Sequence, residues 1–256
     1  MPAPRVDVLG VGISAVNPRT ALEEIAGWVE AGDRRYVCVT GVHGVMESQR
    51  DAELRAVHNR SGLTVPDGMP MVWAGRRAGA VGMSQVQGRV LMLDTLALAA
   101  ERGWRSFLYG GAPGVPELLA RRLTERLPGL RVVGAHAPPF RPLTPGEDAE
   151  IVERINATGA ELVWVGLSTP KQERWMADHR ERLTAPVLFG VGAAFDFLAG
   201  LKPSAPVWMQ DRGLEWSYRL AREPRRLWRR YLRNNPAYLA RIAVDPPRMA
   251  EAGGRG

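Results

Sequence analysis

The chain has 256 residues, of which 45% are hydrophobic and 24% charged, and this ordinary globular composition excludes a wholly disordered protein. Its single cysteine, Cys38, excludes a disulfide framework, and no run approaches the roughly 20 apolar residues that a membrane-spanning helix needs. The formal net charge of +7 lies entirely in residues 202–256, which carry twelve Lys or Arg and five Asp or Glu. With no signal-peptide pattern at the N-terminus, we expect a cytoplasmic protein.

Short β-branched runs alternate with helical periods along the first 200 residues. Asn17 and Pro18 predict a helix start, Thr144 begins a capping-box sequence, and apolar periodicity predicts helices over 90–100 and 118–127. Strands are predicted near 6–13, 35–40, 105–109, 131–135, 161–166 and 187–191. This alternation predicts an α/β fold, a Rossmann-like arrangement with a largely parallel sheet flanked by helices.

The pattern changes after Gly200. Helical segments broken by Pro206, Pro224, Pro236 and the pair 246–247 replace the strand-like runs. We therefore expect an α/β core over residues 1–201 and a basic, helical C-terminal appendage over residues 202–256.

Two glycine-rich segments follow predicted strands and precede helices. One is FLYGGAPG at 107–114 and the other is FGVGAAFDFLAG at 189–200. Glycines let a phosphate approach the backbone, and a helix N-terminus offers unpaired N–H groups, so the first segment indicates a phosphate cradle or simply a tight turn. In the second, Asp196 either caps a short helix or accepts hydrogen bonds from a ligand.

Two further segments place polar groups next to predicted helix starts. In TVPDGMP at 64–70, Asp67 is either a helix cap or a carboxylate that takes a proton from a hydroxyl nucleophile. The segment GLSTPKQE at 166–173 leaves a strand and opens a helix, and its hydroxyl, ammonium and amide donors suit a sugar or a diphosphate. The sequence has no Asp-x-Asp pair, and its four histidines lack metal-ligand spacing, so we expect no bound metal.

The appendage combines arginines with aromatic and aliphatic side chains. Leu227, Trp228, Tyr231 and Leu232 lie within a run that carries Arg222, Arg225, Arg226, Arg229, Arg230 and Arg233. Such a helix suits an anionic membrane surface, nucleic-acid phosphates or a structural contact, and charge alone does not choose among them.

Five parts of the sequence belong together. They are VPDG at 65–68, YGGAPG at 109–114, PKQE at 170–173, FDFLAG at 195–200, and a C-terminal part containing GLEW at 213–216 and EPRRLWRRY at 223–231. In this order they resemble the WecG/TagA/CpsF glycosyltransferase family, and the resemblance covers roughly residues 6 to 240.

The resemblance implies an inverting, metal-independent transferase without a cofactor. Its partners would be a UDP-sugar donor, such as one carrying N-acetylmannosamine or another hexose, and a polyprenyl-diphosphate-linked sugar acceptor at the inner face of the cell membrane. Such enzymes serve cell-surface polysaccharide or teichoic-acid-type synthesis, and a homo-oligomer is possible.

The resemblance also assigns roles to residues. Asp67 matches the proposed general base, Thr40 a threonine near the donor sugar, and Gln172 an active-site glutamine. The predicted donor-binding residues are Gly110, Gly111, Gly114, Gly192, Asp196 and Lys171. The predicted acceptor and membrane residues are Arg219, Arg222, Arg225, Arg226, Arg229, Arg230 and Trp228.

Two segments depart from the family pattern. Family sequences commonly carry Thr-x-Asn and Arg-Val-x-Gly-x-Asp, and here the asparagine, arginine and aspartate are Val42, Gln85 and Val90. His43 and Arg89 can substitute in part for the missing polar residues, whereas the departures themselves allow a donor or acceptor sugar other than N-acetylmannosamine.

Two other functions compete with this interpretation. A non-enzymatic nucleic-acid-binding module would show salt-sensitive binding of DNA or RNA without affinity for UDP. A nicotinamide-dependent oxidoreductase would need a Gly-x-Gly-x-x-Gly turn with an acidic residue about 20 positions later, which the sequence does not convincingly supply.

Overall fold

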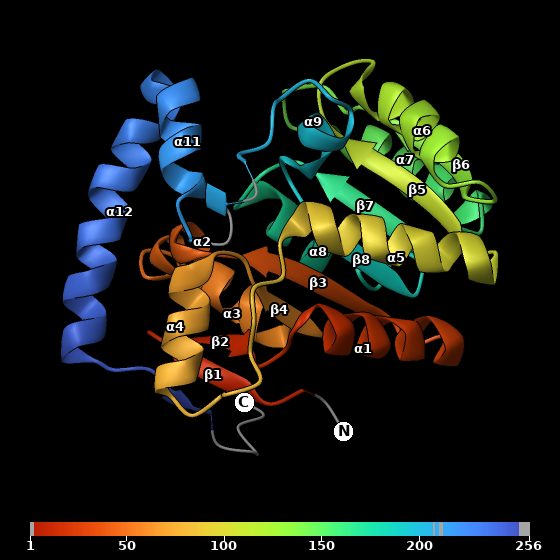
Figure 1. Cartoon of the computed structure of the whole chain (residues 1–256). Coiled ribbons are helices and arrows are strands. Elements are labelled where there is room, and N and C mark those ends of the chain that lie inside the picture. The colour runs from red at the N-terminus through yellow and green to blue at the C-terminus, as the bar shows by residue number, and fades with distance from the viewer. Residues whose placement is uncertain (1–2, 207, 210–211, 251–256) are drawn as a thin grey trace. The chain divides into compact units, whose positions relative to one another are not determined.

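The computed structural model describes residues 3–206, 208–209 and 212–250, except for the side chains of Arg226 and Arg230. The chain folds into two compact units. Unit 1 comprises residues 1–19, 39–87 and 203–256, and unit 2 comprises residues 20–38 and 88–202 (Figure 1). The expected division into a core of residues 1–201 and an appendage of 202–256 stays a prediction, and the structure adds that residues after Pro203 cluster with the N-terminal parts of unit 1.

A six-stranded sheet runs through the fold in the order β4-β3-β8-β7-β5-β6. The pairs β3–β8, β8–β7, β7–β5 and β5–β6 are parallel, which confirms the predicted α/β, Rossmann-like class. β7 and β8 have apolar residues on both faces, as expected of central parallel strands. The strands are β3 (Arg35–Thr40), β4 (Leu63–Pro66), β5 (Arg105–Gly110), β6 (Arg131–His136), β7 (Leu162–Gly166) and β8 (Val187–Gly190).

Helices cross between the strands of unit 2 as predicted. Thr144 caps α7 with the full capping box, and Gly114 with Pro116 begins α6. Helix α9 packs on α5 and on α6, whereas α8 packs on β7 and β8. The helices are α1 (Pro18–Ala31), α5 (Gly88–Arg102), α6 (Val115–Arg126), α7 (Pro145–Ala157), α8 (Lys171–His179) and α9 (Ala194–Leu198).

The predicted strand over 6–13 is wrong as a single element. The chain instead forms an antiparallel hairpin of β1 (Arg5–Val8) and β2 (Val11–Ser14). Leu9 and Gly10 adopt positive φ values of 56° and 80°, and the Gly10 N–H donates to the Asp7 carboxylate at 2.6 Å, which closes the turn. The chain also contains two strands that the sequence analysis did not predict, β4 and the short β9 (Arg248–Met249), which extends the hairpin sheet beside β1.

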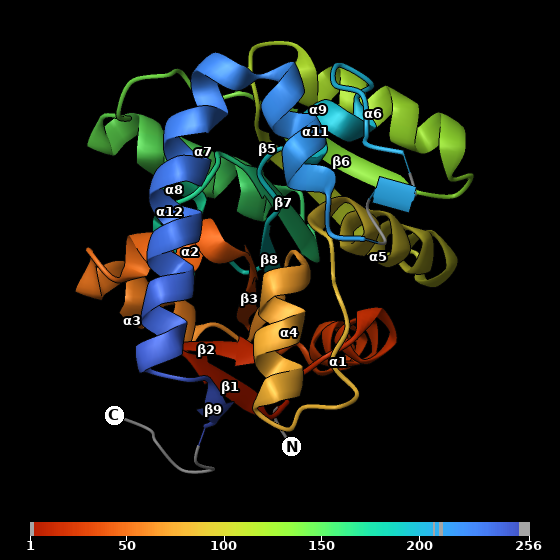
Figure 2. The same ribbon diagram turned by 60° about the vertical axis from the view of Figure 1, so that its left-hand side comes forward.

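Helices surround the hairpin in unit 1. The C-terminal segment bends at Glu223 and Pro224 into two helices, and α12 packs along α2 (Figure 2). The helices are α2 (Val42–Ser48), α3 (Ala52–Arg60), α4 (Met69–Arg77), α11 (Glu215–Arg222) and α12 (Pro224–Val244).

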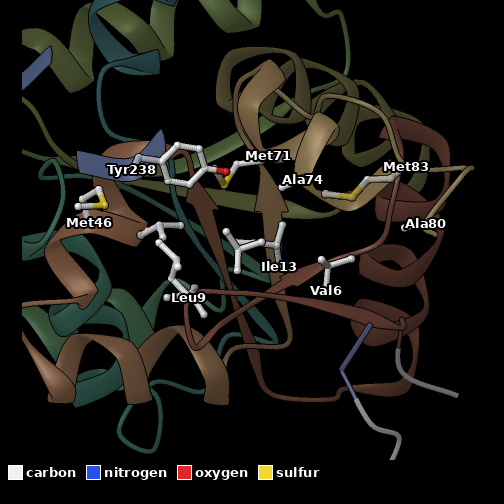
Figure 3. Close-up of a cluster of buried hydrophobic side chains, with 12 residues drawn as sticks. Val6, Leu9, Ile13, Met46, Met71, Ala74, Ala80, Met83 and Tyr238 are labelled. Carbon is white, nitrogen blue, oxygen red and sulfur yellow. The ribbon is translucent and has the colours of Figure 1, made fainter. Parts of the chain in front are cut away.

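The C-terminal helix contributes to the hydrophobic core of unit 1. Tyr238 on α12 is buried in a cluster with side chains from the hairpin, α2 and α4, including Ile13, Met46 and Met71 (Figure 3). Ala237 and Ile242 pack against the same cluster. A chain ending near Gly200 would lack these side chains and β9, so we expect it to lose the packed core of unit 1.

We predict that Tyr238→Ala lowers the free energy of unfolding by about 3–5 kcal/mol, because it removes a buried ring and leaves a cavity. Leu239→Ala is the matched control, since Leu239 is the next residue on α12 and is exposed. Its cost should stay within about 0.5 kcal/mol. Urea unfolding of both variants measures the difference, and equal losses would contradict the placement of Tyr238 in the core.

Candidate active site

Thr40 and Asp67 lie next to each other in unit 1. Thr40 ends β3, Asp67 follows β4, and the backbone N–H of Asp67 donates to the carbonyl oxygen of Thr40 at 2.9 Å. At Gly41, a Cβ atom would lie 2.5 Å from the Asp67 carbonyl oxygen. The close approach of the two strand ends therefore requires glycine at this position.

Asp67 directly precedes the N-cap residue of α4. That residue is Gly68, with a φ of 98°, which has no side chain to accept a capping hydrogen bond. Asp67 itself is half-buried. Asp67 is therefore not the N-cap residue of α4, and its role as general base stays a prediction.

A buried polar region lies behind Thr40. The Thr40 hydroxyl is buried without a hydrogen-bond partner among the described residues, and so is Nε2 of His58. Both side chains lie against Gly44, where a Cβ atom would meet Thr40 Cγ2 at 2.8 Å and His58 Nε2 at 3.6 Å. Orphaned buried polar atoms are uncommon and often mark sites of function.

His58 was considered in the sequence only as a metal ligand, so its buried position was missed. Its Nδ1 lies 3.0 Å from the carbonyl oxygen of Leu54, which can only accept, so Nδ1 carries the proton. Burial lowers the pKa of His58 to about 4, from an ordinary 6.5. His58 is therefore a neutral side chain whose bare Nε2 faces the interior.

In unit 2, three neighbouring strands end on glycine. β5 ends at Gly110, β7 at Gly166 and β8 at Gly190, and Gly110 is in register with Gly166. A Cβ atom at Gly110 would lie 2.7 Å from the backbone of Gly166, and one at Gly166 would lie 2.8 Å from the ring of Phe195. Packing alone requires glycine at these positions, and the predicted contact of Gly110 with a donor stays a prediction.

The start of α8 presents polar groups at these strand ends. Gln172 is 3% exposed and its Nε2 donates to Glu173 Oε1 at 3.1 Å, while its Oε1 has no hydrogen-bond partner in the described part of the chain. Glu173, which the sequence analysis did not single out, also accepts from Thr169 Oγ1 at 2.9 Å. The N-cap residue, Pro170, supplies no side-chain cap, and the backbone N–H of Gln172 donates to the carbonyl oxygen of Ser168 at 3.0 Å, so the start of α8 offers a ligand the positive end of the helix dipole.

An aromatic stack holds α8 in place. The ring of Trp175 stacks on Tyr109 at 4.5 Å and on His179 at 4.2 Å between centroids. His179 Nε2 lies 2.8 Å from the Asp148 carboxylate on α7, and burial raises the pKa of Tyr109 to about 12. These contacts fix the helix whose first turn carries Lys171 and Gln172.

The remaining glycines of the predicted donor site have positive φ values. Gly111 has a φ of 78° and packs near Val115, and Gly114 is the N-cap of α6 with a φ of 83° and open space at its Cβ position. Gly192 has a φ of 52°, and a Cβ atom there would lie 3.2 Å from Gln172 Oε1. Gly192 and Gln172 are therefore brought together.

Asp196 does not cap α9, because the N-cap is Ala193 and Asp196 lies inside the helix. Its carboxylate pairs with Lys202 Nζ at 2.9 Å, which closes the segment that follows the helix. Lys171 is exposed at the start of α8. Ligand contacts for Asp196 and Lys171 stay predictions.

The C-terminal arginines lie on two helices of unit 1. Arg222 lies over the ring of Tyr218 and Arg229 over that of Trp228, at 5.5 and 5.3 Å to the ring centres. Arg225 is exposed and Arg219 half-buried, whereas the side chains of Arg226 and Arg230 lie outside the described residues. The predicted acceptor role of this group stays a prediction.

Two general properties of the described residues bear on the chemistry. No three His, Cys, Asp or Glu side chains within the described ranges are placed to hold a metal ion. None of the helices in the same ranges combines the length and the apolar content that crossing a membrane requires.

The sequence model of the WecG/TagA/CpsF glycosyl transferase family matches residues 6–251, nearly the whole chain. The chain belongs to this family. It is therefore a glycosyltransferase, and the family implies sugar transfer in cell-surface polysaccharide synthesis with a membrane-linked acceptor.

This WecG/TagA/CpsF member replaces a polar residue beside Thr40 with an apolar one. Val42, which stands where family sequences commonly have asparagine, packs against the hydrophobic cluster of unit 1. Gln85 and Val90, the other departures, are half-buried. The polar side chain nearest to position 42 in sequence is that of His43.

We predict that Gly192→Ala weakens UDP binding by more than its loss of stability accounts for, because the new Cβ presses on Gln172 Oε1. Gly114→Ala should also weaken UDP binding if the donor lies against the α6 N-cap. Gly103→Ala is the control, since Gly103 has a φ of 74° and open space at its Cβ position. All three should lower the free energy of unfolding by about 1–2 kcal/mol.

Calorimetric titration with UDP and urea unfolding separate the two effects. A Gly192→Ala protein that loses stability like Gly103→Ala but binds UDP like the wild type would contradict the donor-site assignment.

Proposed function

We propose that the chain is an inverting glycosyltransferase that moves a sugar from a UDP-sugar to a polyprenyl-diphosphate-linked sugar. The family membership supports the transfer of a sugar. The observation that carries the proposal further is the pair of Thr40 and Asp67 at adjacent strand ends. The backbone N–H of the half-buried Asp67 donates to the carbonyl oxygen of Thr40, and the Thr40 hydroxyl is buried without a partner among the described residues. A carboxylate at this strand end suits proton removal from a sugar alcohol.

Asp67 accepts the proton of the acceptor hydroxyl as that oxygen attacks the anomeric carbon of the donor. The new glycosidic bond forms on the face opposite the departing UDP, so the configuration at that carbon inverts. The Thr40 hydroxyl holds the donor sugar by a hydrogen bond, which also satisfies its own buried oxygen.

Unit 2 supplies groups suited to the nucleotide diphosphate. The positive end of the α8 dipole and the ammonium of Lys171 suit the negative charge of a diphosphate. The sequence contains no Asp-x-Asp pair, the usual holder of a divalent ion on such a diphosphate, and we propose that these groups act without a metal.

We predict that Asp67→Asn lowers the transfer rate by roughly 10²–10⁴-fold, because an amide cannot accept the proton. The free energy of unfolding should change little, since the bond to Thr40 comes from the backbone of residue 67. Mass spectrometry of a lipid-diphosphate-sugar acceptor incubated with UDP-sugars measures the product. Asp33→Asn, an exposed substitution outside unit 1, is the control, and near wild-type turnover by Asp67→Asn would remove Asp67 from the role of base.

The same proposal places the protein at the inner face of the cell membrane through α12. Trp228, Leu232 and Leu239 are 45%, 66% and 63% exposed, and their spacing places them along one stripe of the helix. Arg225, Arg229 and Arg233 form an exposed stripe beside it. An apolar stripe next to a basic one is the arrangement of a helix that lies in the interface of an anionic bilayer.

We predict that replacing Arg225, Arg229 and Arg233 together by glutamine weakens binding to anionic vesicles by about 3 kcal/mol, or roughly a hundredfold, at moderate salt. Co-sedimentation with vesicles containing phosphatidylserine measures the binding. The matched control replaces three exposed arginines of unit 2, Arg121, Arg126 and Arg131, by glutamine. Equal vesicle binding by the two triple variants would refute the membrane role of α12, and RNA binding lost only in the α12 variant would favour the nucleic-acid alternative.

A further inference from the structure

Four side chains of unit 1 form a network of contacts between α2 and α12. Asn234, which is 4% exposed on α12, accepts a hydrogen bond from Arg50 Nη2 through its Oδ1 at 3.3 Å. Its Nδ2 lies 3.2 Å from His43 Nδ1 on α2. Arg50 Nη1 also donates to Glu47 Oε1 at 2.9 Å, and that oxygen lies 3.8 Å from His43 Nδ1. The network therefore consists of His43, Glu47, Arg50 and Asn234.

The donors and acceptors of this network determine which nitrogen of His43 carries the proton. A guanidinium group only donates, so the side-chain atom of Asn234 that faces Arg50 is the oxygen. The amide NH₂ then faces His43 and donates to Nδ1. A neutral imidazole that accepts at Nδ1 carries its proton on Nε2.

Glu47 has the opposite effect on His43, because a nearby carboxylate favours the protonated ring. The distances of Glu47 and Asn234 from His43 Nδ1 decide which of the two sets the protonation of His43. The Glu47 oxygen lies 3.8 Å from Nδ1, beyond hydrogen-bond range, and already accepts from Arg50, whereas Asn234 Nδ2 lies within range at 3.2 Å.

We infer that Asn234 is a positioning residue that holds His43 in the Nε2-protonated tautomer and ties α12 to the first turn of α2. His43 follows Thr40 by three residues, and Val42 between them is partly buried against the hydrophobic cluster of unit 1. The network thus fixes His43, whose polar side chain is the nearest in sequence to position 42, where family sequences commonly carry asparagine. Its effect on sugar transfer rests on the proposed function, whereas the tautomer does not.

Nuclear magnetic resonance of protein labelled with ¹⁵N-histidine tests this inference directly. The chain has four histidines, and a His43→Phe variant assigns the signals of His43 by their absence. Spectra recorded at about pH 8.5, roughly two units above the ordinary histidine pKa, should show His43 with a bare Nδ1 and a protonated Nε2. A proton on Nδ1, or a fully protonated ring, in the wild-type protein would overturn the inference.

An Asn234→Asp variant supplies the second arm. A carboxylate at 234 still accepts from Arg50 but offers only an acceptor to His43, so the proton of His43 should move to Nδ1 or the ring should become charged. Asn235→Asp adds the same charge one residue along α12 and should leave the spectrum of His43 unchanged. Unchanged His43 signals in Asn234→Asp would also overturn the inference.

Transfer kinetics of the same two variants then test the positioning role. We expect Asn234→Asp to lower kcat by roughly tenfold with a smaller change in KM, and Asn235→Asp to change neither. Equal kcat values for both variants would contradict the positioning role. A wild-type protein that shows the expected tautomer but transfers no sugar would refute the proposed function but not the inference about Asn234 and His43.

Discussion

The packing at the carboxyl ends of four parallel strands depends on glycines, which have no Cβ atom. Gly41 follows β3, and Gly110, Gly166 and Gly190 end β5, β7 and β8. At each of these positions a Cβ atom would meet another heavy atom at 2.5–2.8 Å, closer than real side-chain atoms come. Small residues at this edge let the backbone of Asp67 reach Thr40, and let the side chain of Gln172 lie against β8. Ligands of open α/β folds bind at the carboxyl ends of the strands. The close contacts at these glycines therefore also determine which polar groups lie where a ligand would bind.

The C-terminal helices are part of the folded core as well as a charged surface. On α12, Leu227, Asn234 and Tyr238 share one buried face, and β9 continues the hairpin sheet beyond the helix. The sequence suggested an appendage because arginines dominate this segment and prolines interrupt it. Three buried residues spaced seven and four apart are a weak signal among so many charges, although a single buried aromatic ring can contribute several kcal/mol.

The parts of the fold that the sequence predicted are those set by local chemistry. Thr144 and Glu147 predicted a capping box and the structure contains it, because both partners lie within one turn. The hairpin at Leu9 was missed because a leucine with positive φ has no sequence signal, and only Gly10 beside it hints at a turn. β4 was missed because four residues ending in proline do not resemble a strand without the neighbouring strand β3.

For the candidate site, the sequence located the residues but not their partners. The motif around Asp67 predicted its place after a strand, whereas its hydrogen bond to Thr40 joins residues 27 positions apart and depends on the sheet. The burial of His58 Nε2 and the network around Asn234 could not be predicted for the same reason, because both depend on segments that only the tertiary fold brings together. Asp196 shows the converse: its local pattern allowed a cap, and the pairing with Lys202 six residues later displaced that possibility.

The two faces of α12 connect the stability of unit 1 to the surface binding proposed for this helix. The buried face holds Tyr238 in the core of unit 1, and the exposed face carries Trp228, Leu232 and Leu239 beside arginines. Since separate stripes of the helix serve the two contacts, the exposed stripe can meet a surface while Tyr238 stays in place. The free energy of such binding therefore adds to that of folding unit 1 and does not compete with it. A helix that had to leave the core in order to bind would instead lose the several kcal/mol that burial of Tyr238 contributes.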